Sequence, residues 1–77
     1  MPDPIEQLRA LHAPVAMTDV EAILGKPQAD IGSGIHIYTY ALASGATVRV
    51  GTPDAQHVMY ITVIDGSGKQ VIYQQAP

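Results

Sequence analysis

The chain has no cysteine, tryptophan or phenylalanine, and only four lysines and arginines in 77 residues. The lack of cysteine excludes a disulfide framework, a thiolate nucleophile and a cysteine-ligated zinc site. The four cations, Arg9, Lys26, Arg49 and Lys69, are spread along the chain, and the net charge is −3. Nucleic-acid-binding proteins concentrate basic residues on one face. We therefore expect no nucleic-acid partner.

Long apolar runs are also absent. No run reaches the roughly 18 residues that a membrane-spanning helix needs. The N-terminal stretch MPDPIEQL has neither the basic nor the apolar segment of a signal peptide. We therefore expect no membrane span and favour a cytoplasmic location. A periplasmic or secreted location would follow if a signal peptide had been removed.

The short chain is rich in hydrophobic residues. Hydrophobic residues make up 47% of the sequence, and the mean hydropathy is +0.12. We expect a single domain over residues 1–77, and a chain this short buries only about 60–65% of its unfolded surface. Surplus apolar surface usually marks an interface, so the composition predicts a homo-oligomer. The alternative is a monomer with scattered surface aliphatics.

The first helix is predicted over about 4–12. Asp3 can cap it, Pro4 suits the first helical position, and the apolar residues that follow recur at helical spacing. Pro14 forces the helix to end shortly before it.

A second short helix is predicted over about 19–24. Thr18 is its expected N-cap, and Glu21 completes a capping-box pattern three residues later. Gly25 suits the left-handed position at its C-terminus, and Pro27 prevents continuation. So short a helix cannot repay its nucleation cost alone, so it must pack against something.

From Gly34 onward the pattern becomes that of strands, which are expected at about 35–43, 46–51, 57–65 and 69–75. Turns are expected at Ser44-Gly45 and at Gly66-Ser67. The fold class is therefore α+β, with two short N-terminal helices packed on one face of a four-stranded antiparallel meander.

The two turns also predict which residues share a face, because side chains alternate along a strand. They pair Tyr40 with Arg49, and Tyr60 with Tyr73. The predicted core face is Ile35, Ile37, Thr39, Ala41, Val48, Val50, Met59, Ile61, Val63 and Ile72. The opposite face, away from the helices, is predicted to hold all four tyrosines with an arginine and a histidine: His36, Tyr38, Tyr40, Arg49, Tyr60 and Tyr73.

No pattern indicates catalysis or a metal site. The histidines, His12, His36 and His57, have no metal-ligand spacing. Each is expected to lie at the surface. The serines lack a nucleophile motif, and Asp30, Asp54 and Asp65 are interpreted as turn formers whose side chains bond their own backbone. We expect no catalytic residue, metal or cofactor.

The glycine-rich stretch Gly32-Ser33-Gly34 raises the question of a phosphate site. A phosphate cradle needs a glycine loop that leads into a helix N-terminus. Here the stretch leads into a strand, and no Lys-Ser/Thr follows it. We interpret it as a bend that the backbone freedom of glycine permits.

Three segments resemble a known family: Met17-Thr18 through Glu21 to Leu24-Gly25-Lys26-Pro27, then Gly32-Ser33-Gly34, then Tyr38 and Tyr40 through Leu42 and Gly45 to Val48. Together they resemble the beta-lactamase-inhibitor-protein-like superfamily, which includes bacterial outer-membrane assembly lipoproteins of the small protein A type. The match covers about half of the chain. It implies a helix–loop–helix packed on an antiparallel sheet, in domains that contact proteins and are generally not enzymes. The lipobox cysteine of the lipoproteins is missing, and Ser44 replaces the usual acidic residue of the hairpin.

The sequence thus favours a non-enzymatic protein-interaction module, whose partner is a second copy or another protein. Its predicted binding residues are His36, Tyr38, Tyr40, Arg49, Tyr60 and Tyr73. Tyrosine and arginine are frequent in interface hot spots because they combine contact area with hydrogen bonding. The same tyrosines could be purely structural, since aromatic pairs also stabilise sheets. The alternative function is a small-molecule binder or minor enzyme with a pocket between sheet and loops, using His36, Tyr38, Arg49 and His57.

Overall fold

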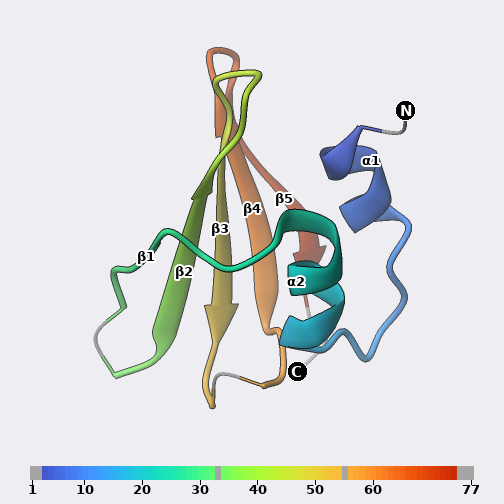
Figure 1. Ribbon diagram of the computed structural model, residues 1–77, viewed down its shortest axis with the longest axis vertical. Helices are drawn as coiled ribbons and strands as arrows, with labels where there is room; N and C mark the ends of the chain where they lie inside the picture. The colour runs from blue at the N-terminus through green and yellow to red at the C-terminus, as the bar shows by residue number, and fades with distance from the viewer. Residues whose placement is uncertain (1–2, 33, 55, 75–77) are drawn as a thin grey trace.

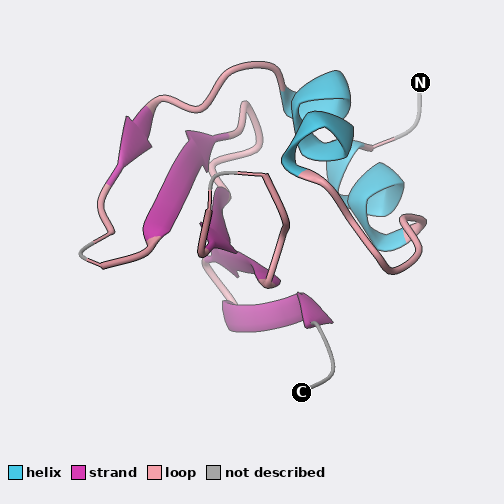
Figure 2. Ribbon diagram, turned by 90° about the horizontal axis from the view of Figure 1, so that it is seen from below, coloured by secondary structure: helices cyan, strands magenta, loops and turns pink. Residues whose placement is uncertain are grey.

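The computed structural model describes residues 3–32, 34–54 and 56–74. Two short helices are followed by a five-stranded antiparallel sheet in which neighbours in sequence are neighbours in space, in the order β1-β2-β3-β4-β5 (Figure 1). The elements are α1 (Pro4–Arg9), α2 (Met17–Leu24), β1 (Ala29–Asp30), β2 (His36–Ala41), β3 (Thr47–Thr52), β4 (Tyr60–Asp65) and β5 (Gly68–Gln74). Both helices lie on the same side of a curved sheet (Figure 2).

The α+β class is consistent with the structure, but the predicted four-stranded sheet is wrong. The additional strand is β1, whose two residues pair with Thr39 and Tyr38 of β2. Gln28 secures this pairing, because its backbone N–H donates to Thr39 O and its side-chain oxygen accepts from the Ala41 N–H. These bonds join Gln28 to Thr39 and Ala41, the second of which lies 13 residues away, so no local sequence pattern predicts β1.

The helices begin near the predicted positions, with different boundaries. Asp3 caps α1 as expected, since its carboxylate accepts from the Ile5 N–H at 2.8 Å, but α1 ends at Arg9 rather than near residue 12. α2 begins at Met17, so Thr18 is not its N-cap. Instead the Asp19 carboxylate reaches back to the Ala16 N–H at 3.0 Å, which satisfies a donor that would otherwise be unpaired at the helix start.

The β2–β3 hairpin has a wider turn than predicted, and this changes the faces. The Leu42 N–H donates to Ala46 O and the Gly45 N–H to Leu42 O, with Gly45 at φ +93°, so three residues separate the paired ends. Tyr40 therefore lies opposite Val48, not Arg49. A one-residue shift moves every side chain of a strand to the other face, so Tyr38 and Tyr40 lie on the helix-covered side.

The β4–β5 hairpin has the predicted turn but contains a bulge. Asp65 pairs with Gly68 across Gly66-Ser67, as expected, and the register then shifts between Ile61 and Thr62. Ile72 is the extra residue. As a result Tyr73 lies opposite Ile61, and the predicted pair of Tyr60 with Tyr73 is wrong, because a bulge reverses the alternation beyond it.

The core lies between the helices and the inner side of the sheet. Leu8 and Val20 from the helices meet Val48, Val50 and Ile61 from the strands, and each of these side chains is at most 1% exposed. The predicted core residues Ile37, Thr39 and Ala41 are not part of this cluster, because the hairpin register turns them outward. Tyr40 takes their place at 3% exposure.

Two sequence predictions involve residues outside those described: Ser33 of the glycine-rich stretch, and Gln75 at the expected end of the last strand. For the described part of the stretch, the interpretation as a bend is supported. A side chain at Gly32 would collide with the backbone of Ile35 and Ile37, and Gly34 has φ +86°.

Candidate functional site

The predicted tyrosine cluster is divided between the two faces of the sheet. Tyr38, Tyr40 and Tyr73 pack against the core on the helix-covered side. Arg49 and Tyr60 lie on the other side, where no helix covers the sheet. His36 shares the side of Tyr38, and their rings stack at 5.7 Å between centroids, with 3° between planes.

We call the uncovered side the open face. The ladders place three rows of side chains on it, one from each of β2, β3, β4 and β5 in every row. These residues are Ile37, Gly51, Tyr60 and Gln74; Thr39, Arg49, Thr62 and Val71; and Ala41, Thr47, Ile64 and Lys69. The face thus combines hydroxyls, aliphatic groups and two cations.

Two features give the open face its shape and charge. The ring of Tyr60 lies against Gly51 of the neighbouring strand, where an added Cβ would overlap the ring. Arg49 and Lys69 are exposed. All seven acidic residues of the chain are described, and none lies on this face. The face is therefore positively charged on a chain with a net charge of −3.

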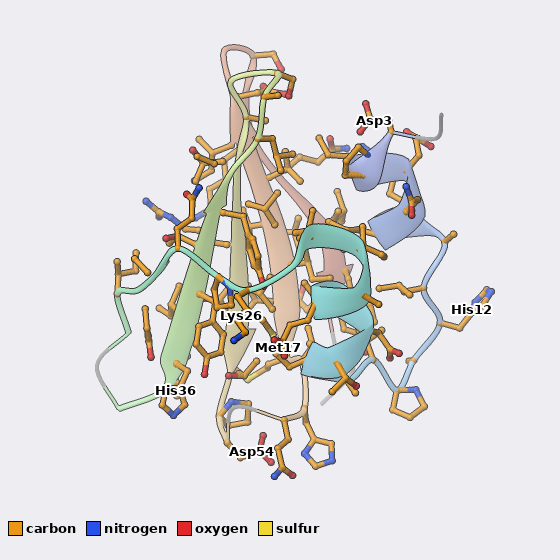
Figure 3. All side chains as sticks on the ribbon, viewed as in Figure 1. Asp3, His12, Met17, Lys26, His36 and Asp54 are labelled. Atoms are coloured by element: carbon orange, nitrogen blue, oxygen red, sulfur yellow. The ribbon has the colours of Figure 1, made fainter. Side chains whose placement is uncertain are left out.

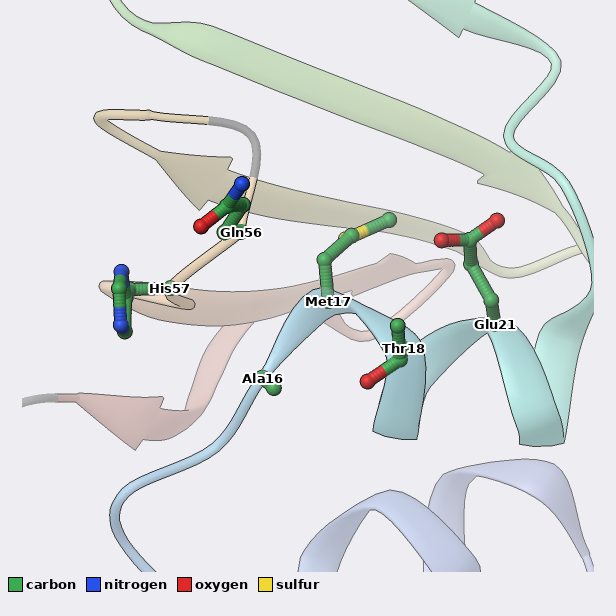
Figure 4. Close-up of a pocket in the computed structure, with 6 residues that line it drawn as sticks. All are labelled: Ala16, Met17, Thr18, Glu21, Gln56 and His57. Atoms are coloured by element: carbon green, nitrogen blue, oxygen red, sulfur yellow. The ribbon is translucent and has the colours of Figure 1, made fainter.

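The second candidate site is a pocket of about 380 Å³ between α2 and the loop that joins β3 to β4. A short antiparallel bridge holds its two walls together. The Met17 N–H donates to Gln56 O at 2.7 Å, and the Val58 N–H donates to Val15 O at 2.9 Å. The pocket is lined by Ala16, Met17, Thr18, Glu21, Gln56 and His57 (Figure 4).

The orientation of His57 is fixed by Asp54. The Nδ1 of His57 lies 2.6 Å from Oδ2 of Asp54, and the other carboxylate oxygen accepts from the backbone N–H groups of Gln56 and His57. The backbone N–H of His57, its ring and the Gln56 N–H hold the pKa of Asp54 well below its usual value. An ionised Asp54 keeps a proton on Nδ1, so a neutral His57 ring offers Nε2 as an acceptor.

Glu21 is the charged group at the other end of the pocket. Its carboxylate has no hydrogen-bond or ion-pair partner among the described residues, and the residue is half-buried. Its negative charge also acts on the phenol group of Tyr40. Burial, with the charges of Glu21 and Tyr38, raises the pKa of Tyr40 to about 12, and the Tyr40 hydroxyl donates to Gly25 O at 3.0 Å.

A second histidine–aspartate pair lies at the same end of the sheet. His36 Nδ1 is 2.7 Å from Asp30 Oδ2, and the Asp30 Oδ1 accepts from the N–H groups of Gly32 and Ile37. His36 and Asp54 mark this end of the molecule in Figure 3. The bond from His36, with those two backbone N–H groups, lowers the pKa of Asp30. Neither residue of this pair lines the pocket, so His36 can serve as a control for His57 in binding experiments.

Sequence reasoning found part of the pocket and missed the rest. Of the four polar groups predicted for a pocket, only His57 lines it. Asp54 was correctly interpreted as a turn former that bonds its own backbone, but its role as the partner of His57 was missed. Its position three residues before the histidine was the available signal. Thr18 and Glu21 were assigned only to helix capping, because the bridge that brings them to Gln56 joins distant segments.

Neither a metal centre nor a membrane span emerges from residues 3–32, 34–54 and 56–74. Within these ranges no three histidine, aspartate or glutamate side chains come together in a way that could hold a metal ion. No helix there has the length and apolar character to cross a membrane.

Comparisons with protein-family models, curated proteins and solved structures find no match for this chain. The resemblance to the beta-lactamase-inhibitor-protein-like superfamily therefore stays a prediction that rests on short motifs. Within the described residues, the open face and the pocket support proposals about function.

Proposed function

We propose that this chain is a small, non-enzymatic protein-interaction module that binds an acidic protein surface through its open face. The observation that carries the proposal is the separation of charge. Arg49 and Lys69 lie on a face that has no acidic side chain among the described residues, between hydroxyl and aliphatic groups that can bond and pack against a partner. Complementary charge steers encounter and selects partners.

The face is a better docking surface than the edges of the sheet. β1 has only two residues, which is too short to align another strand. β5 is longer, but it carries the bulge at Ile72 and the charge of Lys69. Short edges, bulges and lysines are the features that protect sheets from strand addition. We therefore place the partner on the open face rather than along an edge.

The same charges disfavour a symmetric dimer through this face. Such a dimer would bring Arg49 and Lys69 of one copy toward those of the other, and like charges across an interface are unfavourable. Apolar surface offers little compensation, because Ile31 and Val71 are the only large hydrophobic residues that are exposed in the described part of the chain. A partner other than a second copy therefore fits the face better, and the predicted homo-oligomer stays a prediction.

The experiment compares two double variants with the same net charge. Arg49→Glu with Lys69→Glu reverses the open face, while Arg9→Glu with Lys26→Glu reverses the two cations outside it. The probe is a synthetic peptide in which glutamate alternates with leucine, and its lysine–leucine counterpart is the control. Binding is followed by backbone amide shifts in NMR spectra at two salt concentrations.

We expect saturable shifts at Arg49, Thr62 and Lys69, and about a tenfold loss of affinity in the open-face variant, since exposed charge contacts contribute up to about 1 kcal/mol each. The other double variant should bind nearly as well as the original chain. Equal losses in both variants would show that only net charge matters, and would overturn the proposal. Light scattering on a sizing column, with the same variants, tests the homo-oligomer separately.

A further inference from the structure

The pocket between α2 and the β3–β4 loop is not needed for binding at the open face, so it invites a separate explanation. It is held in shape by backbone bonds rather than by flexible side chains alone. The bonds from Met17 to Gln56 and from Val58 to Val15 fix the start of α2 against the loop. A cavity of about 380 Å³ also falls in the range of about 300–1,000 Å³ that is typical of small-molecule sites.

Two polar groups of the pocket, Glu21 and His57, offer acceptors, while Thr18 and Gln56 can donate as well as accept. Glu21 offers an unpartnered carboxylate, and His57 offers Nε2 because Asp54 binds its Nδ1. None of the four lysines and arginines lines the pocket. Unbalanced negative charge favours a cation and disfavours an anionic ligand.

The shape separates these acceptors. In Figure 4, Glu21 and His57 lie at opposite ends of the pocket, and Met17 and Thr18 lie between them. The Met17 side chain is buried and supplies a flexible apolar surface, to which Ala16 adds a methyl group. A ligand that satisfies both ends must therefore be elongated, with an apolar middle.

We propose that this pocket binds a small aliphatic amine. The ammonium group donates to the Glu21 carboxylate, and the alkyl chain packs on Met17. A second donor at the far end of the ligand reaches Nε2 of His57. A charge-assisted hydrogen bond in a partly desolvated site is stronger than the same bond in open water.

Two alternative ligand classes fit less well. A metal ion would need convergent ligands, whereas the two acceptors are at opposite ends and no three such side chains meet in the described ranges. A carboxylate or phosphate ligand would face Glu21 without a cation to balance it. The chemistry of the lining thus selects an amine over both.

The test uses 1,4-diaminobutane as the probe, with butylamine and butyrate as comparisons. Binding is followed by the backbone amide signals and by the ring C–H signals of His57 and His36. We expect saturable shifts at Thr18, Glu21, Gln56 and His57, with His36 unaffected. Butylamine should bind more weakly because it lacks the second donor, and butyrate should not bind.

Matched variants separate the site from general charge attraction. Glu21→Gln should weaken the binding of the diamine about tenfold, as expected for the loss of a charged hydrogen bond. Glu6→Gln, on the exposed surface of α1, should leave it unchanged. His57→Gln should reduce the preference for the diamine over butylamine, and His36→Gln should not.

Three results would overturn the proposal. The first is the absence of saturable shifts with the diamine. The second is an equal effect of Glu21→Gln and Glu6→Gln, which would indicate non-specific attraction to acidic side chains. The third is tighter binding of butyrate than of butylamine. None of these results affects the proposed role of the open face, because Arg49 and Lys69 do not line the pocket.

Discussion

Thr52, the last residue of β3, is fully buried, and its hydroxyl has no hydrogen-bond partner among the described residues. A buried hydroxyl without a partner costs about 1–3 kcal/mol. Valine has nearly the same shape and replaces the hydroxyl with a methyl group, and it is an equally good strand residue. We therefore expect Thr52→Val to raise the free energy of unfolding by about 1–2 kcal/mol. For a domain of this size, each kcal/mol raises Tm by about 4–8 °C.

The assay is urea unfolding followed by circular dichroism, with thermal unfolding as a second measure. The dependence of free energy on urea should not change, because the same surface is exposed on unfolding. Thr62→Val is the matched control: Thr62 is 3% exposed, but its hydroxyl is not among the buried atoms without a partner. A Thr52→Val variant that is no more stable than the original chain would refute the reasoning. It would indicate that the hydroxyl has a partner, such as a buried water molecule.

Three further changes test other parts of the structure. Tyr40→Phe removes the bond to Gly25 O and should cost about 1 kcal/mol at neutral pH. The pKa of Tyr40 is raised from 10.0 to about 12 on folding, so the original chain should also lose stability as the pH rises from 10 toward 12. The variant should not show this part of the loss. An alkaline titration followed by circular dichroism measures the difference. Asp54→Asn removes a carboxylate whose pKa is lowered on folding. The contribution of this carboxylate to the stability of the fold is present above pH 3.8 and lost at lower pH. The variant should therefore be less stable at neutral pH and less sensitive to acid, as measured by Tm across pH. Gly51→Ala should displace the Tyr60 ring, seen as a change in its NMR signals, while stability changes by less than about 1 kcal/mol, because alanine is the better strand residue.

Local sequence signals were enough to predict most of the elements. Asp3 and Pro4 marked the start of α1, and alternation located the four longer strands, because capping and side-chain period depend on near neighbours. The same signals could not predict β1. Its pairing depends on the Gln28 side chain, which binds the backbone of β2.

The faces of the sheet were harder to predict than its strands. A third residue in the turn before Ala46 and one extra residue at Ile72 each shift the register by one. Either shift exchanges the two faces of a strand, and neither changes the apolar pattern of the sequence. This is why Tyr38 and Tyr73 were expected on the same open face as Tyr60, although both pack toward the core.

The candidate pocket could not be predicted from the sequence for a similar reason. Its lining comes from residues 16–21 and from Gln56 and His57, which are brought together by a bridge between distant segments. Only the Asp54–His57 pair had a local signature. A spacing of three residues within a turn can be recognised from sequence, and the wall opposite it cannot.

The order of the strands also has a consequence for how the chain folds. Each strand pairs with the next one in sequence, so every ladder closes over a short loop, which is associated with fast folding. The contact of α1 with β5, which includes the bond from Arg9 to Gln70, instead closes a loop of most of the chain. Its entropy cost is larger, so we expect α1 to dock last. During synthesis, α1 would then lack its contact with β5 until β5 had left the ribosome, although its contact with α2 could form earlier.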